Sequence, residues 1–204
     1  HFTVSQVNPK ARGLAGAYER EAIRPNIAGS FETLLRAAIL HPGMLRYLDN
    51  QKSVGPHADA VMGGGKPKIK AAGLNENLAR ELLELHTLGA ESSRPRAGGA
   101  VVYGQRDVQE LARVLTGWTT PQTQGATEAV VFNASRHEPG SKVVLGRTYP
   151  QGPEALGRVL RDLAREPATA HFLATKLVRH FIADEPPADL VDQMAAAYLR
   201  ADAQ

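Results

Sequence analysis

The sequence of 204 residues contains no cysteine. This absence excludes a disulfide scaffold, a cysteine nucleophile and any metal or iron–sulfur site built on thiolates. Long hydrophobic runs are missing as well. No stretch of about 18 apolar residues occurs, so we expect no membrane-spanning helix.

Motifs for common cofactors and catalytic centres are also missing. The sequence has no HExxH or Glu-x-x-His pair for zinc or di-iron, and no GxSxG elbow for a serine hydrolase. The GGGK at Gly63 to Lys66 is not a phosphate loop, because Ala60 stands where a glycine is required and Pro67 replaces Ser or Thr. We therefore find no signal for a nucleotide or haem, and a zinc protease is not indicated.

Excess charge is small. The chain has 24 Lys and Arg against 21 Asp and Glu, which gives a formal charge of +3. The densest basic stretch, Gly63 to Lys70, carries three lysines with no aromatic residue beside them. Nucleic-acid surfaces usually combine basic residues with stacking aromatics, so we interpret this stretch as a solvated loop and expect no nucleic-acid partner.

What the sequence has in abundance is helical periodicity. Apolar residues recur at helical spacing, and Gly, Ser or Pro flank many of these segments. The expected helices cover Phe31 to Ile39, Pro42 to Leu48, Asn75 to Leu88, Gln105 to Leu115, Leu156 to Leu163, Ala170 to Phe181 and Leu190 to Tyr198.

The periodicity predicts a mostly α protein, an irregular multi-helix bundle with long loops, organised as a single helical domain over residues 1–204. The loop insertions cover about 49–74 and 119–152. A short β-like run at Val130 to Phe132 and another at Lys142 to Leu145 predict one small hairpin around 129–146.

The strongest functional signal is the segment that begins at Asn75, which we expect to cap the helix. At about 100° per residue, Asn77, Glu81 and Glu84 share one stripe, whereas His86 falls on the apolar side. The paired carboxylates could serve as general acid and base, or hold a divalent cation with Asn77 as a carbonyl ligand.

The same segment also fits a purely structural role. Arg80 is four residues from both Glu76 and Glu84, which are ordinary ion-pair spacings on a helix. His86 is then a hydrogen-bonded core histidine rather than a ligand. Both readings stay open on the residue pattern alone.

Several segments together carry a family resemblance. They are Asn75 to Gly89 (NENLARELLELHTLG), Tyr103 to Trp118 (YGQRDVQELARVLTGW), Gly29 to Asn50, His137 to Gly146 (HEPGSKVVLG) and Ala168 to Pro187. These segments, which follow one another along the chain in the same order as in the family, resemble the bacterial domain of unknown function 1800 family along nearly the whole chain. The family usually has His-Asp-x-Gly in the fourth of these segments, where this chain has a glutamate.

The resemblance implies an exported bacterial protein, located in the periplasm or outside the cell. Family members are typically longer, so this chain is expected to be the central portion of a larger protein, with flanking parts packed against it. The resemblance implies no activity, and the sequence does not indicate an oligomeric state.

We therefore hypothesise a polar cleft between the Asn75 helix, the Gln105 helix and the His137 loop. Its catalytic or metal-binding residues would be Glu81, Glu84 and His137, acting as a hydrolase. The supporting or substrate-binding residues would be Asn75, Asn77, Arg80, His86, Arg113 and Lys142. The alternative is a non-catalytic helical module that binds an envelope partner or extracellular polymer, in which these residues form a structural ion-pair network.

Overall fold

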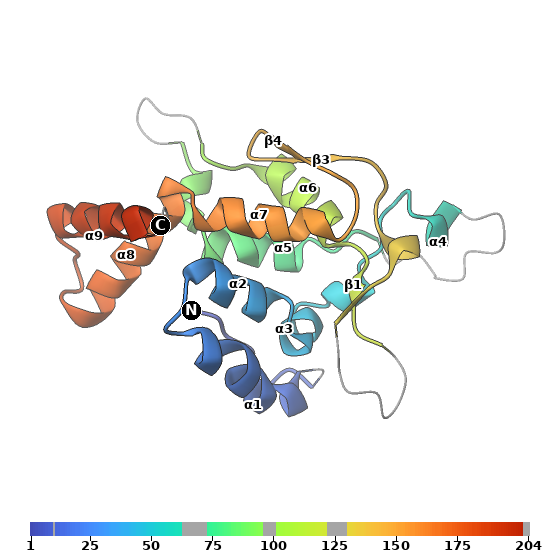
Figure 1. Ribbon diagram of the computed structural model, residues 1–204, viewed down its shortest axis with the longest axis horizontal. Coiled ribbons are helices and arrows are strands. Elements are labelled where there is room, and N and C mark those ends of the chain that lie inside the picture. The colour runs from blue at the N-terminus through green and yellow to red at the C-terminus, as the bar shows by residue number, and fades with distance from the viewer. Residues whose placement is uncertain (10, 63–72, 96–100, 122–129, 202–204) are drawn as a thin grey trace.

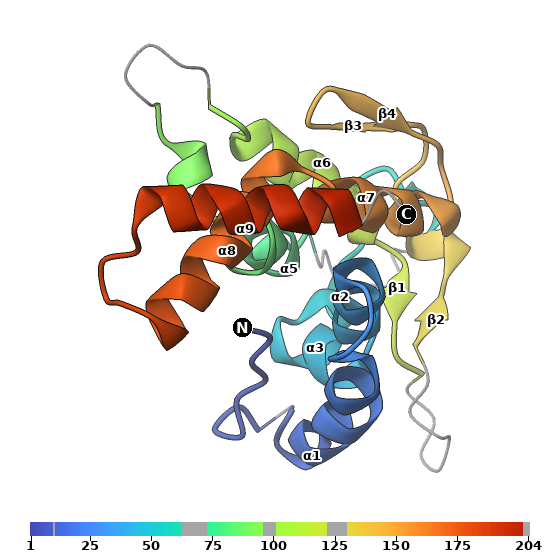
Figure 2. The same cartoon turned by 60° about the vertical axis from the view of Figure 1, so that its left-hand side comes forward.

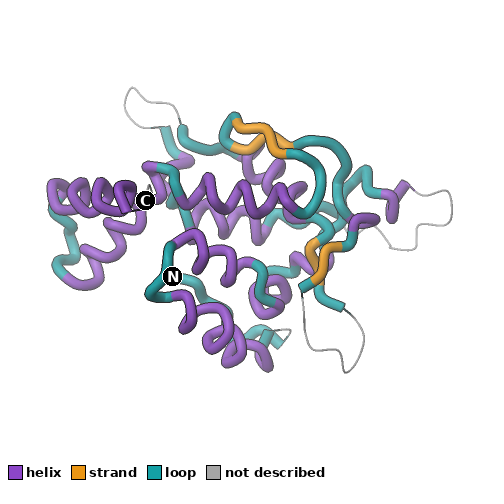
Figure 3. Tube along the Cα trace, viewed as in Figure 1, coloured by secondary structure: helices purple, strands orange, loops and turns teal. Residues whose placement is uncertain are grey.

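The computed structural model describes residues 1–9, 11–62, 73–95, 101–121 and 130–201, and in this part of the chain helices dominate (Figures 1 and 3). The mostly α fold class is confirmed. The α-helices are α1 (Ala15–Tyr18), α2 (Phe31–Ile39), α3 (Pro42–Tyr47), α4 (Asp59–Met62), α5 (Asn77–Glu81), α6 (Gln105–Leu115), α7 (Glu154–Ala164), α8 (Pro167–Phe181) and α9 (Ala188–Ala201). None of the described helices is long and apolar enough to cross a bilayer.

Shorter helical turns connect these helices. The 3-10 turns are Arg12–Leu14, Arg24–Asn26, Asn50–Lys52, Ala90–Ser93 and Ala134–Arg136, and the π-helical turns are Glu19–Ile23 and Leu82–His86. The sequence analysis does not predict the nearly continuous helical stretch from Arg12 to Asn26. Its buried residues are only Tyr18 and Ala22, so its apolar stripe is too short to stand out against the charged residues around it.

The small β structure differs from the predicted pairing. Strand β2 (Val131–Phe132) pairs antiparallel with β1 (Trp118–Thr119), and β3 (Lys142–Val144) pairs with β4 (Arg147–Tyr149). The predicted hairpin between β2 and β3 is therefore wrong in its pairing, although both segments are strands. In the β1–β2 pair the Trp118 and Phe132 rings are in contact, with their centroids 5.3 Å apart.

A tight turn explains the second strand pair. Leu145 and Gly146 both have positive φ, 50° and 73°, as the two-residue hairpin turns that match strand twist require. Of the two predicted loops, residues 63–72 and 122–129 lie outside the described residues, and so does the whole basic stretch from Gly63 to Lys70.

One main core fills the space between α2, α3, α5, α6 and α7. Leu35, Leu78, Leu111 and Leu160, from four of these helices, are almost completely buried in it. The periodicity therefore identifies the inward face of these helices correctly. Burial of leucines of this kind contributes roughly 1.5–3 kcal/mol each.

Helices α8 and α9 form a hairpin that projects from this body in Figure 1 and faces the viewer in Figure 2. A separate, smaller core lies between them, made by Ala170, Ala174 and Val178 of α8 with Val191 and Ala195 of α9. Two hydrogen bonds attach the hairpin to α7. Thr169 Oγ1 donates to the Leu163 carbonyl and the Tyr198 hydroxyl donates to the Ala164 carbonyl, both at 2.7 Å.

The helical segment that follows α5 ends at His86, two residues before the predicted end at Leu88, and the chain then turns at Gly89. Its φ is 84°, a conformation that residues with a Cβ rarely adopt. A Cβ at this position would also lie 2.6 Å from Cδ2 of Phe172 on α8. This glycine therefore allows the α8 hairpin to approach the main body.

We expect Gly89→Ala to lower the free energy of unfolding by about 1–3 kcal/mol, because backbone strain and the clash with Phe172 act together. Chemical denaturation with far-UV circular dichroism measures this loss. Gly13→Ala is the matched control, since a Cβ at Gly13 meets no atom within 4 Å. Equal stabilities of the two variants would contradict the assignment.

Candidate functional site

His137 lies in a buried pocket behind β3, only 3% exposed. Its Nδ1 donates to the Thr116 carbonyl at 2.8 Å, which leaves Nε2 as the acceptor. Nε2 accepts from Lys142 Nζ at 2.9 Å and from the Gly152 amide at 3.3 Å. Burial is the main cause that lowers the pKa of His137, with the positive charge of Lys142 adding to it. Both ring nitrogens are therefore occupied by protein groups.

Lys142 completes this arrangement, which we call the His137–Lys142 clamp. The side chain is almost fully buried, and burial lowers its pKa to about 8. Its ammonium donates to His137 Nε2, to the Glu138 carbonyl and, at 2.8 Å, to the Gly140 carbonyl. A protonated lysine has three hydrogens to donate, so all of them are used to close the loop on itself.

Glu138, the residue after His137, binds a second loop through His57. The Glu138 amide donates to Thr116 Oγ1 at 2.8 Å, and the Glu138 carboxylate accepts from the His57 amide at 2.9 Å and contacts His57 Nδ1 at 2.7 Å. Gly55 must be a glycine here, because a Cβ would lie 2.6 Å from Cα of Glu138. The sequence analysis missed His57, and no spacing in the sequence connects it with Glu138.

Helix α5 begins one residue later than predicted, because its N-cap is Glu76, which makes no side-chain cap bond, and Asn75 lies just before it. The Asn75 side chain accepts from the Asn77 amide at 2.9 Å and donates to the Leu48 carbonyl at 3.1 Å. The regular α-helix is short, however, because the segment Leu82–His86 continues as a π-helical turn. Extra residues in a turn change the direction of the side chains that follow, so the projected stripe applies only as far as Glu81.

An ion-pair network joins this helix to α6. Arg80 donates to Glu76 at 3.1 Å and lies 3.6 Å from Glu84, so both predicted i, i+4 pairs are present. Gln105 links the two helices, because its amide donates to Glu76 and its carbonyl oxygen accepts from Arg80. Glu76, Arg80 and Glu84 are between 29% and 41% exposed, and pairs that open to water contribute at most about 1 kcal/mol each.

Glu81 differs from its neighbours. Within the described ranges it forms no hydrogen bond or ion pair, and partial burial together with the charge of Glu84 raises its pKa. None of the described contacts of His137 involves Glu81 or Glu84. The three predicted catalytic residues are therefore not joined into one group by any described contact. His137 belongs to the His137–Lys142 clamp, whereas Glu81 and Glu84 belong to the Asn75 segment.

Two supporting residues also take structural positions. Arg113 pairs with Glu110 on α6, and the other Glu110 oxygen accepts from the Val143 amide at 3.0 Å. His86 is buried, as predicted for a core histidine, with its ring 5.0 Å from that of Phe2. Its Nδ1 has no hydrogen-bond partner among the described residues, so the predicted hydrogen-bonded state is wrong at this atom.

The metal alternative receives no support from the geometry. In the part of the chain that the structure describes, no group of three or more His, Asp or Glu side chains is placed to hold a metal ion. Protein sites for zinc or calcium generally need at least three such ligands. Glu81, Glu84 and His137 do not form such a group.

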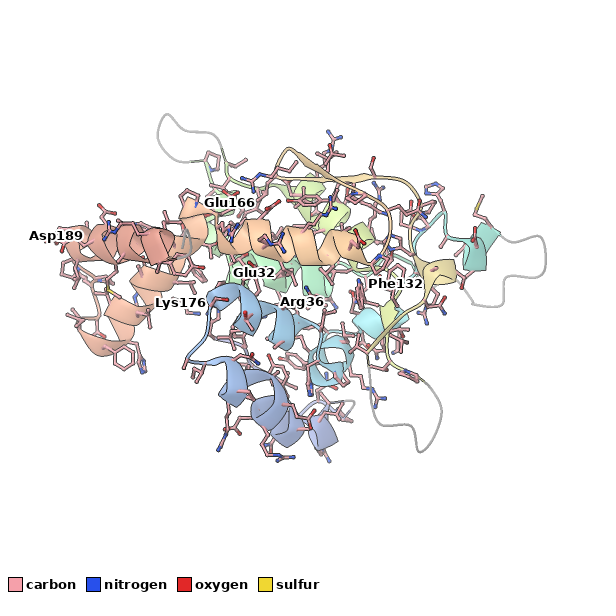
Figure 4. All side chains as sticks on the ribbon, in the orientation of Figure 1. Glu32, Arg36, Phe132, Glu166, Lys176 and Asp189 are labelled. Atoms are coloured by element: carbon pink, nitrogen blue, oxygen red, sulfur yellow. The ribbon has the colours of Figure 1, made fainter. Side chains whose placement is uncertain are left out.

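A separate feature, which the sequence analysis missed, is an apolar groove of about 1030 Å³ between α2 and α8. Phe31 and Leu34 of α2 line one wall, and Leu173, Leu177 and Phe181 of α8 line the other. We call it the α2–α8 groove. Figure 4 labels Lys176, which also lines it, beside the start of α2.

Comparison with known proteins gives one match. A family model described as "Protein of unknown function (DUF1800)" matches residues 1–204. The chain therefore belongs to the DUF1800 family. No curated protein and no solved structure matches the chain, so the geometry alone must carry any functional argument.

We expect Lys142→Met to lower the free energy of unfolding by about 2–4 kcal/mol, because two carbonyls and His137 lose a buried donor. Lys52→Met is the control, since Lys52 is 59% exposed, and it should change stability by less than about 0.5 kcal/mol. Urea denaturation of both variants measures the difference. Unchanged stability of the Lys142 variant would argue against a structural clamp.

The burial of His86 leads us to expect that the stability of the protein depends on pH. Burial is the main cause that lowers its pKa from 6.5 to about 4. Above pH 6.5 the ring is neutral in both states, whereas between pH 6.5 and about 4 only the unfolded chain binds the proton. Stability conferred by the wild-type residue therefore falls as the pH drops through this window, by roughly 3 kcal/mol in total.

The measurement is the free energy of unfolding of the wild type and of His86→Gln at several pH values between 7 and 4. The difference between the two proteins should be constant at about pH 7 and shrink toward pH 4. Other titrating groups are common to both proteins and cancel. A difference that does not change with pH would contradict the buried, neutral state of His86.

Proposed function

We propose that this member of a family of unknown function is a non-catalytic helical module that binds a partner through the α2–α8 groove. The observation that carries the proposal is the outward apolar stripe on α8. Leu177 is 47% exposed and Phe181 is 72% exposed, next to a groove with mostly apolar walls. Contiguous apolar surface of this kind on a protein is typical of an interaction site.

The polar residues support the same proposal, because their contacts serve the fold. A general base must direct a lone pair at its substrate. In His137 that lone pair already accepts from Lys142, and Lys142 has no hydrogen left to donate. The clamp therefore fits the structural role in the second of the two sequence hypotheses.

The hydrolase hypothesis stays a prediction for Glu81 and Glu84. A carboxylate with a raised pKa beside a second carboxylate is one pattern of acid and base catalysis, and Glu81 has such a pKa. The periplasmic or extracellular location and the bacterial origin also stay predictions, as does the packing of flanking parts of a longer protein against this region.

The test titrates the protein with three labelled probes: an amphipathic helical peptide with acidic flanks, one with basic flanks, and a fluorescent long-chain fatty acid. At least one probe should bind saturably with one-to-one stoichiometry. Leu177→Glu should weaken that binding at least tenfold, which corresponds to about 1.4 kcal/mol.

Leu85→Glu is the matched control, because Leu85 is also 47% exposed but is not part of the groove lining. It should change the affinity by less than about twofold. Thermal unfolding followed by circular dichroism verifies that both variants fold. Absence of binding by every probe, or equal loss in both variants, would contradict a binding role for the groove.

A further inference from the structure

Helix α8 has two apolar faces, and only one of them is covered. Ala170, Ala174 and Val178 pack against α9. Leu173, Leu177 and Phe181 recur at the same spacing on the neighbouring face and line the groove. Residues four apart lie above one another on a helix, so this second stripe is continuous over two turns.

The opposite wall of the groove is also helical. Phe31 and Leu34 come from the first turn and a half of α2, Ile23 comes from the preceding helical stretch, and Ile27 follows directly after that stretch. Ile27 is 69% exposed although it lies at this wall. Two helical walls with apolar side chains between them form the kind of groove in which a third helix packs its own apolar face.

The groove lining contains two cationic side chains, Lys176 and Arg179. No Asp or Glu belongs to the lining, among the residues that the structure describes. Lys176 lies over the Phe172 ring at 5.1 Å and has no ion pair with a described carboxylate. Among the described residues, Arg179 donates only to a backbone oxygen, that of Asp184 at 3.3 Å. The two cations that line the groove, Lys176 and Arg179, therefore have no partner among the described carboxylates.

We propose that the occupant is an amphipathic helix of a partner protein, with acidic residues flanking its apolar face. This inference rests on the proposed binding function and adds the chemistry of the partner. Lys176 and Arg179 are three residues apart on α8, and carboxylates spaced three or four residues apart on a docked helix match this repeat.

The shape of the groove favours a helix over a fatty acid. A small ligand usually has most of its surface enclosed by its pocket, whereas this groove is partly open to solvent. A fatty acid also carries a single negative charge, whereas the lining of the groove offers two cationic side chains, Lys176 and Arg179. A helix uses the open part for its own polar face and offers several carboxylates.

The experiment measures fluorescence anisotropy of two labelled peptides of about 18 residues, long enough to form helix on binding. Both have the same leucine stripe, with Glu on the flanks in one and Lys in the other. The wild type should bind the acidic peptide at least tenfold more tightly than the basic one. Raising the salt concentration should reduce this preference.

Charge reversal makes the test specific. Lys176→Glu combined with Arg179→Glu should reverse the preference, so that the basic peptide binds more tightly than the acidic one. Arg106→Glu is the control, since Arg106 is exposed on α6 and is not part of the lining. That variant should keep the wild-type preference.

The other outcomes separate this inference from the proposed function. Equal or tighter binding of the basic peptide or of the fluorescent fatty acid, still lost in Leu177→Glu, would overturn the acidic helix and leave the groove as a binding site. If sedimentation shows a dimer of the wild type and a monomer of Leu177→Glu, the occupant is a second copy of the chain. If a photo-crosslinker at residue 177 reacts with the same polypeptide, the occupant is a flanking segment. Both would overturn the proposal, and binding of none of the probes would overturn the binding function itself.

Discussion

Burial of the Lys142 ammonium is the constraint on which the centre of this structure depends. An unpaired charge inside a protein costs several kcal/mol, so the chain must bring three acceptors to it. Two are carbonyls of its own loop and the third is His137, which is fixed in turn by the Thr116 carbonyl at the end of α6. Thr116 also accepts from the Glu138 amide, and the Glu138 carboxylate holds the loop at His57. One buried charge thus connects α6, the β3–β4 hairpin and a distant loop that share no regular secondary structure.

The helices could be predicted because their periodicity records burial directly. Val108, Leu111 and Leu115 are all buried on α6, as their spacing requires. The strand pairing could not be predicted in the same way. A strand of two or three residues carries too little alternation to select its partner, and the choice depends on the contact between Trp118 and Phe132 and on the turn at Leu145.

The candidate site shows a similar limit. Residue types and helical spacing correctly predicted the ion pairs of Arg80, because both partners lie on the same helix. Convergence of Glu81 with His137 required knowledge of which elements pack together, and sequence without tertiary contacts does not contain it. The π-helical turn after Glu81 adds a further obstacle, since no simple residue preference marks where a helix widens. His57 was missed for the same reason, because its carboxylate partner lies 81 residues away in sequence.

The apolar stripe of α8 predicts more than a helix, because its width also indicates how many partners the helix packs against. Ala170, Leu173, Ala174, Leu177, Val178 and Phe181 together cover an arc wider than one packed helix needs. Helix α9 covers the narrow half, where the side chains are small, and the large side chains remain outside. A core made mostly of alanine and valine buries little area, so the hairpin gains less from its own packing than the main body does. Any helix that binds the outer stripe would bury the larger residues and stabilise the hairpin together with the interface. The width of an apolar stripe on a single helix can therefore indicate a second contact, before the partner is known.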